Sequence, residues 1–446
     1  MADHDRTTPR TISRRSRSLR RYTYAGFSRH VWKRRLVFLS GAIVVALVAV
    51  GFAQLADLAQ EVFNHALKHW MWLPLFVTPI SFAVLAYITR RWYPAAQGSG
   101  IPQVIAARAS KDQAHRFSLL DWRMAIAKIV MTSVAILTGA SVGREGPSVQ
   151  IGASIMFAIA GFARLGRADG LVLAGSAAGV AAAFNAPLAG IVFAIEEVAK
   201  SFTGRVNELV LGSVIVAGGV SWLLLGNYSY FGGGSARVIS GFDWLAVLVC
   251  AIIGGALGGL FSRTMIAIVF HPPEWVAKLK RHPIYFAAIC GLVVAILSIA
   301  TNGYASGSGY TETRSGLYFG ITIPWYYGLA KMVATLLSAV SGIPGGLFSP
   351  SLAAGAGIGS MVAEVLTFVE PRNVLLLMMA GYFAGVVQSP LTAAVIVIEM
   401  TSDRAMVIPL LATALLASSV SRVISRRPLY HALSLTFAQK PATRKP

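Results

Sequence analysis

Long apolar stretches alternate with short polar segments along the whole chain. A transmembrane helix needs about 20 mainly apolar residues, and several stretches approach or exceed that length. Other apolar stretches are interrupted by Gly and Pro. The pattern predicts an all-α polytopic membrane protein. The clear spans are Leu36 to Leu55, Leu73 to Thr89, Leu209 to Gly226, Trp244 to Phe270, Tyr285 to Ala300 and Ala405 to Ile424.

A second pattern is an internal repeat with an offset of 203 residues. The block Gly143-Arg144-Glu145-Gly146-Pro147 returns, without a gap, as Gly346-Leu347-Phe348-Ser349-Pro350. The same offset places Pro187-Leu188 on Pro390-Leu391 and Glu196 on Glu399. The chain therefore reads as two related halves, about 36–204 and 205–430. Paired interrupted segments in two halves are typical of a transporter and point to its binding site.

Composition and charge indicate how the chain is oriented in the membrane. The chain is 55% hydrophobic and only 13% charged, which excludes an ordinary soluble protein of this length. Its net charge of +21 comes mostly from the ends, and the first 35 residues contain eleven Arg or Lys. Basic flanks of membrane spans stay in the cytoplasm. We therefore expect residues 1–35 to form a basic cytoplasmic arm and 431–446 a short cytoplasmic tail.

Two termini on one side require an even number of crossings. Two equal halves with an odd number each are then inverted relative to one another, which puts a substrate site at their junction. The alternative use of the basic arm is contact with nucleic acid or lipid headgroups. Topology alone explains the charge, so we expect the lipid bilayer and no nucleic acid as partner.

Three segments have a composition that favours anions. Gly98-Ser99-Gly100-Ile101-Pro102, Gly143 to Pro147 and Gly345 to Pro350 each combine Gly, which turns sharply, with Pro, which suits a first helical turn. Each predicts a loop that ends in a helix N-terminus inside the membrane. Exposed N–H groups and the positive end of the helix dipole favour an anion there.

Glu145 follows an apolar stretch, where a charge is costly. An ionisable residue at membrane depth is a functional hypothesis by default. The alternative is a structural carboxylate paired with Arg144.

The two cysteines, Cys250 and Cys290, lie in apolar runs, and no metal or disulfide spacing is present. We expect no metal and no cofactor.

The sequence resembles the CLC family of chloride channels and chloride/proton exchangers. The resemblance extends from about Gly98 to Tyr430 and depends on four motifs in order: Gly-Ser-Gly-Ile-Pro, Gly-Arg-Glu-Gly-Pro, Gly-x-Phe-x-Pro and Pro-Leu-Tyr. It implies two inverted-topology repeats of tilted and broken helices, with about 18 membrane-embedded segments. It also implies a multi-pass protein of a cell inner membrane, a homodimer with one pathway in each subunit, and a transporter rather than an enzyme.

The resemblance also assigns residues. Ser99 and Tyr430 offer hydroxyls to a central chloride. Leu347, Phe348 and Ser349 offer backbone N–H groups. Glu145 resembles the gating glutamate, and Gly98, Gly100, Arg144 and Gly146 contribute the backbone around the anion pathway. Ser349 departs from the Ala that relatives often carry, and the sequence leaves the direction of its side chain open.

A second acidic pair requires a choice. Glu196 has a repeat partner in Glu399 and is expected to belong to the shared architecture. Glu197 faces Met400 and matches the family's inner proton-transfer glutamate, which exchangers keep. The alternative is a capping or packing carboxylate. The predicted function is antiport of chloride and protons, and the alternative is a passive voltage- or pH-gated chloride channel on the same fold.

Three weaker expectations concern other positions. Ser99 resembles the chloride-preferring form of the first motif, whereas a Pro there resembles nitrate-preferring members. Asp403 and Arg404 are expected in a solvated loop. Glu364, in an apolar run without a repeat partner, is expected to form a buried hydrogen bond. A membrane enzyme would need a nucleophile–base pair or metal cluster, and the sequence places no His or Cys beside its acids.

Overall fold

The structure is a computed structural model that describes residues 29–164, 169–199, 208–226, 229–233, 236 and 239–438. Its described part is helical throughout, apart from loops and two isolated backbone bridges. Residues 1–28 of the predicted arm and 439–446 of the predicted tail lie outside the described residues. The helix α2 begins at Arg29, within the segment predicted as a basic arm.

The elements of the first half are α2 (Arg29–His69), α3 (Pro74–Trp92), η1 (Pro94–Ala96), α4 (Ile101–Ala109), α5 (Gln113–Leu120), α6 (Trp122–Leu137), α7 (Glu145–Phe162), α8 (Asp169–Phe184), α9 (Pro187–Phe193), the π-helical turn η2 (Ala194–Ala199) and α10 (Glu208–Leu225).

Those of the second half are η3 (Gly241–Asp243), α11 (Trp244–Phe270), α12 (Glu274–Lys280), α13 (Pro283–Ala300), α14 (Tyr310–Tyr318), α15 (Tyr327–Val340), α16 (Phe348–Val365), α17 (Pro371–Val387), α18 (Pro390–Thr401), η4 (Arg404–Met406), α19 (Val407–Ile424), α20 (Leu429–Ser434) and η5 (Leu435–Phe437).

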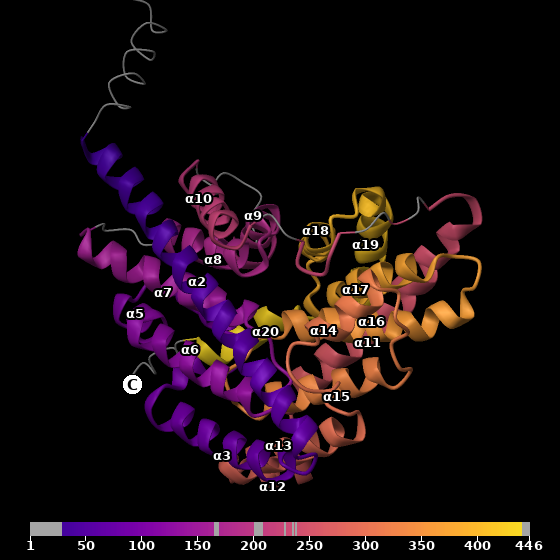
Figure 1. The fold of residues 1–446 in the computed structure, drawn as a ribbon. Coiled ribbons are helices and arrows are strands. Elements are labelled where there is room, and N and C mark those ends of the chain that lie inside the picture. Colours follow the sequence, from indigo (N-terminus) through magenta and orange to yellow (C-terminus); the bar gives the residue numbers. More distant parts are fainter. Residues whose placement is uncertain are drawn as a thin grey trace, which may run out of the picture.

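The two halves have the same architecture, as the repeat predicts. Eight helices correspond in order: α2, α3, α4, α6, α7, α8, α9 and α10 match α11, α13, α14, α15, α16, α17, α18 and α19. The packing partners also correspond, since α8 packs on α7 and α10, and α17 packs on α16 and α19. Figure 1 shows the first half, in indigo to magenta, on the left and most of the second, in orange to yellow, on the right.

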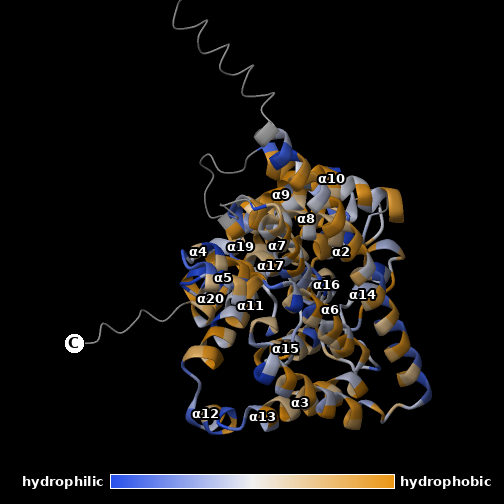
Figure 2. Ribbon diagram, turned by 90° about the vertical axis from the view of Figure 1, so that its left-hand side faces the viewer, coloured by the Kyte–Doolittle hydropathy of each residue, from blue (hydrophilic) through white to orange (hydrophobic). Residues whose placement is uncertain are grey.

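The distribution of polarity is that of a membrane protein. Five helices of the described chain are long and apolar enough to span a membrane, and they cover five of the six predicted spans; α3 covers the sixth. Large apolar side chains such as Phe76, Ile215 and Leu223 are exposed, whereas Lys128 and Gln150 are fully buried. Figure 2 shows apolar helices at the outside of the molecule and hydrophilic residues at loops such as that around α12.

The halves meet at their interrupted segments. Gly143 and Gly346, which are repeat partners, form an antiparallel bridge in which each N–H donates to the other's carbonyl, at 2.9 and 2.7 Å. A bridge between equivalent residues requires a local pseudo-twofold axis. It brings the N-termini of α7 and α16 together, and these helices begin at Glu145 and Phe348 as the motifs predict.

Two expectations for the second half are wrong. Asp403 is 2% exposed and pairs with Arg372 at 2.7 Å, while its other oxygen accepts the N–H of Ala236. It therefore ties α17 to two loops instead of lying in a solvated one, although Arg404 is exposed. Glu364 is exposed at the end of α16 and not buried, because its position on the helix turns it away from the core.

Candidate functional site

The centre of the molecule is a meeting of helix N-termini. Residues in the first turn of a helix have N–H groups without intrahelical partners, and these groups carry the positive end of the helix dipole. In α7 they belong to Glu145 and Gly146, and in α16 to Phe348 and Ser349; a Pro follows each pair and has no N–H. The bridge between Gly143 and Gly346 directs both sets to one region, which suits a small anion.

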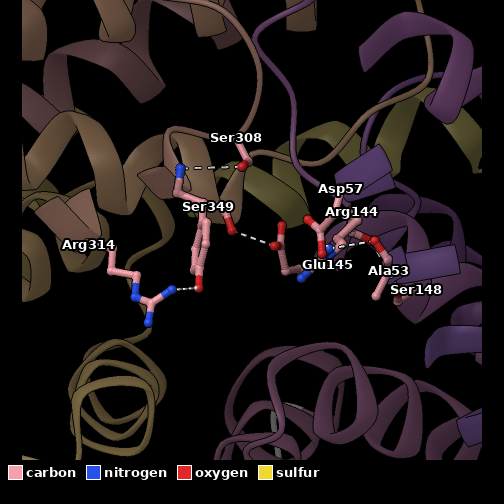
Figure 3. Close-up of polar contacts among 9 residues, drawn as sticks. Ala53, Asp57, Arg144, Glu145, Ser148, Ser308, Arg314 and Ser349 are labelled. Carbon is pink, nitrogen blue, oxygen red and sulfur yellow. Dashed lines mark hydrogen bonds and ion pairs between the residues drawn. The ribbon is translucent and has the colours of Figure 1, made fainter. Parts of the chain in front are cut away.

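Glu145 lies in this region and is fully buried. Its Oε1 accepts a hydrogen bond from the Ser349 hydroxyl of α16, and its Oε2 lies directly over the α-carbon of Gly143. A side chain on Gly143 would collide with this carboxylate. Figure 3 shows Glu145 and Ser349 pointing toward one another. The carboxylate thus bends back over its own helix N-terminus and reaches the N-terminus of the other.

Arg144 is not the partner of this carboxylate. Its guanidinium pairs with Asp57 at 2.5 Å, donates to the Ala53 carbonyl at 2.6 Å, and stacks over the Tyr230 ring at 5.5 Å. These contacts anchor the start of α7 to α2, on the side away from Ser349 (Figure 3). The alternative of an Arg144–Glu145 pair is therefore not what the structure contains. Arg144 is the N-cap residue of α7.

The two predicted hydroxyls belong to residues that lie beside the first turns of α7 and α16. Ser99 Oγ lies so close to the α-carbon of Gly146 that a β-carbon there would be 2.3 Å away. The Tyr430 ring is 5.9 Å from the Phe348 ring. Both hydroxyls are buried, and neither forms a hydrogen bond of normal geometry with the described part of the chain. They are available to a ligand acceptor.

The loop that carries Ser99 depends on its glycines. Gly100 precedes α4 with φ of 98°, and a β-carbon there would lie 2.8 Å from Gln150 Cβ, so only glycine fits. Gly98 pairs with the second half, since its N–H donates to Ile343 and its carbonyl accepts from Gly345, each at 3.1 Å. The loops of both repeats are therefore connected through backbone hydrogen bonds.

Two cavities are lined by residues that belong to or contact the central segments. One, of about 140 Å³, is lined by Ser99, Pro102, Leu347 and Thr436 among others. The other, of about 190 Å³, includes Asp57, the partner of Arg144, and residues of the loop before α14. Leu347, next to Phe348, lines the first cavity, and Asp57 connects the second to the start of α7 through its ion pair with Arg144.

Two buried lysines, which the sequence reasoning missed, support the loops. Lys128 Nζ donates to the carbonyls of residues 96–98 at 2.6–3.4 Å, and Lys331 Nζ to those of 305–307 at 2.6–3.2 Å. Their positions differ by the repeat offset of 203, and each supports a Gly-Ser-Gly triplet, at 98–100 and 307–309. A search of the sequence for Lys or Arg pairs separated by 203 residues would have identified them.

Glu196 and Glu399 have reciprocal structural roles. Glu196 accepts the N–H groups of Leu391 and Thr392, at the N-terminus of α18, at 3.2 and 2.6 Å. Glu399 accepts those of Leu188 and Ala189, at the N-terminus of α9, at 3.0 and 2.6 Å. Each acid caps the equivalent helix of the other half. The prediction that Glu196 belongs to the shared architecture is confirmed.

Glu197 has different surroundings. It is buried, accepts a hydrogen bond from Ser389, and lies 3.9 Å from Nε2 of His431, which is partly exposed on α20. It belongs to the π-helical turn η2, whereas its repeat partner Met400 lies in regular α-helix. Such turns shift side-chain directions and are frequent at functional sites. No group of three or more potential metal ligands occurs in the described part of the chain.

These features match known proteins. A family model described as voltage gated chloride channel matches residues 81–422. The H(+)/Cl(-) exchange transporter ClcA of Yersinia pestis bv. Antiqua (strain Angola) is 31% identical over 434 residues, which cover 90% of this chain and 87% of that protein. ClcA of Salmonella agona (strain SL483) is 29% identical over 443 residues, which cover 91% and 90%.

Solved structures agree on the fold. A slow cyanobacterial Cl-/H+ antiporter superposes with a TM-score of 0.79 at 23% identity, covering 92% of this chain and 99% of that one. A CLC-type fluoride/proton antiporter gives 0.73 at 24% identity, covering 90% and 96%. Together with the family model, these similarities establish a membrane transport protein fold. The chain belongs to the voltage-gated chloride channel family, the CLC family.

Proposed function

We propose that this protein exchanges chloride for protons across a membrane, with Glu145 as the gate of the anion pathway. The observation that carries the proposal is the position of Glu145. Its buried carboxylate lies at two convergent helix N-termini, and no ion pair to it occurs among the described residues. The exchange activity in the names of the ClcA relatives supports the same proposal.

In this mechanism a dehydrated chloride binds the free N–H groups of the Leu347-Phe348-Ser349 turn and the hydroxyls of Ser99 and Tyr430. Among the described residues, the cation adjacent in sequence to Glu145 is Arg144, and Asp57 engages it, so the proposed site uses no full cation. A site built from helix ends and hydroxyls binds an anion firmly enough to remove its water and weakly enough to release it. Gly98, Gly100 and Gly146 allow the backbone to approach closely.

Protons enter the same cycle through two carboxylates. Ionised Glu145 competes with chloride for the helix N-termini; once protonated, it loses that attraction and moves aside. Glu197 supplies the second proton position, buried beside Ser389 and 3.9 Å from His431 of α20, the helix that also carries Tyr430. In this proposal the proton route passes Glu197 and His431 on its way to one side of the membrane.

We propose the location and assembly that the family resemblance implies. The protein lies in a cell inner membrane with both termini in the cytoplasm. Residues 36–430 form the transport domain, and the Ser99 and Tyr430 side faces the cytoplasm. Two copies form a homodimer with one complete pathway each. Cysteine labelling of the termini from either side of the membrane, and the mass of the purified particle, test these points.

The test is a coupled flux measurement in liposomes that contain the purified protein. A chloride gradient should drive protons in the opposite direction, against their own gradient, and external pH records this movement. Chloride flux without proton movement would leave a passive channel as the function. Repeating the measurement with nitrate and fluoride tests the anion preference that Ser99 predicts, and chloride should give the fastest exchange.

Two variants test the roles of the acids. Glu145→Gln should keep chloride flux and lose its proton coupling, because a neutral gate neither competes with chloride nor exchanges a proton. Glu197→Gln should also stop proton movement while chloride still passes. Glu399→Gln is the matched control, since that acid caps α9 and should leave coupling intact. Coupling that persists in Glu145→Gln would remove this residue from the gate.

A further inference from the structure

Ser349 occupies a position where the two halves differ. The repeat places it on Gly146, and both residues lie in the first turn of a central helix. Gly146 has no side chain and packs against Ser99. Ser349 has a hydroxyl, and this hydroxyl is buried and donates to Oε1 of Glu145 (Figure 3). The direction that the sequence left open is therefore toward the gate.

We propose that Ser349 is a positioning residue that holds the ionised gate carboxylate at the helix N-termini and so sets how strongly that carboxylate competes with chloride. This inference rests on the proposed role of Glu145 as the gate. It concerns the side chain of Ser349, whereas the proposed chloride contact uses its backbone N–H. The two functions can therefore be separated by substitution.

Few other groups are placed to hold the Glu145 carboxylate. Glu145 Oε2 has no hydrogen-bond partner in the described structure. The neighbouring cation, Arg144, is committed to Asp57 and the Ala53 carbonyl. The Tyr230 ring lies under the Arg144 guanidinium, 5.5 Å from it, and no hydrogen bond from Tyr230 to the carboxylate occurs among the described residues. Among the side chains described, Ser349 gives the carboxylate its direct hydrogen bond.

A hydroxyl suits a gate that must leave. A lysine or arginine at this position would hold the carboxylate too firmly for exchange, whereas a hydroxyl gives one charge-assisted hydrogen bond. That bond is strong while the carboxylate is ionised and weaker after it takes a proton. A hydrogen bond to a charged group changes a population by about tenfold or more. Ser349 therefore favours the closed position by this factor without making it permanent.

The test measures chloride binding to the detergent-purified protein by isothermal titration at neutral pH. In Ser349→Ala the carboxylate competes less well, so the chloride dissociation constant should fall by about tenfold. A thiol is a weaker donor than a hydroxyl, so the chloride dissociation constant of Ser349→Cys should lie between those of the unchanged protein and Ser349→Ala. Ser351→Ala is the matched control, because Ser351 is likewise buried on α16 and its hydroxyl has no hydrogen-bond partner in the described structure.

The decisive measurement repeats Ser349→Ala in a Glu145→Gln background. There the substitution should leave the chloride dissociation constant unchanged, because no carboxylate remains to be held. An unchanged constant in the single variant, or an equal change in both backgrounds, would overturn the positioning role. Failure of the gate itself is distinguishable: Glu145→Gln would then still couple chloride to protons in liposomes, whatever Ser349→Ala does.

Discussion

The two halves of the molecule have nearly the same scaffold and different chemistry at its centre. Features that build the scaffold occur in both: the bridged glycines 143 and 346, the loop-supporting lysines 128 and 331, and the capping acids 196 and 399. Features that the proposed function uses to carry protons, or to contact the proposed gate, occur once. At the repeat offset Glu145 aligns with Phe348, Gly146 aligns with Ser349, and Glu197 aligns with Met400.

This difference teaches how a symmetric fold obtains a directional activity. An inverted duplication gives two equivalent sets of helix ends and hence a central anion site. Proton coupling requires an acid on the anion path and a second acid on one side only, so it needs asymmetry. In this chain the first half has both acids of the proposed proton route, and the second half contributes the Ser349 hydroxyl that contacts Glu145, the proposed gate.

The largest expected effect is a loss of stability on replacing either buried lysine, and it tests whether the two halves share one scaffold. Lys128→Met or Lys331→Met leaves three carbonyls without their donor, which should cost about 3 kcal/mol of stability in each case. Melting of the purified protein, followed by size-exclusion chromatography after heating, measures this loss. The two halves should respond alike.

Chloride binding should separate the same two variants. Lys128 supports the loop of Ser99, which is proposed to bind chloride, whereas Lys331 supports the loop of Ser308, which lines the other cavity. Lys128→Met should therefore weaken chloride binding more than Lys331→Met. Equal losses of chloride affinity would argue against a special role for the Ser99 loop.

An intermediate effect is expected at Gly146. A methyl group there would lie 2.3 Å from Ser99 Oγ and 3.2 Å from the Gly346 α-carbon, so Gly146→Ala must displace the Ser99 hydroxyl. Losing one hydrogen bond to the bound anion should weaken chloride binding by about tenfold or more. The control is Gly161→Ala on the same helix, where the added carbon meets nothing within 4 Å. Titration of both variants with chloride measures the difference.

The smallest effect is expected at the reciprocal caps. Glu196→Gln and Glu399→Gln each replace a charged cap by a neutral acceptor, and each should cost about 1 kcal/mol of stability. The losses should be similar, and proton coupling should persist in both. Glu364→Gln, at an exposed position of α16, should change neither quantity. A loss of coupling in Glu196→Gln alone would show that this acid does more than cap α18.

Much of the fold follows from the sequence. Apolar runs of sufficient length predict the spans, because a bilayer accepts few other structures. Gly and Pro at matched positions predict the interrupted helices, and α7 and α16 begin where the motifs place them. The repeat offset alone separates Glu196, which has a partner, from Glu197, which does not. These are local or periodic properties, and a single chain displays them directly.

Other features required the tertiary structure, because they depend on contacts between distant residues. The sequence places Arg144 beside Glu145, yet the fold turns it to Asp57 on α2. The sequence predicts Asp403 in a solvated loop, whereas the fold buries it in an ion pair with Arg372. The direction of the Ser349 hydroxyl is decided only when the helix N-termini of both halves meet. The sequence by itself determined which residues repeat and which do not; packing across the pseudo-twofold axis decided which of them touch, since no local pattern encodes a contact over some 200 residues.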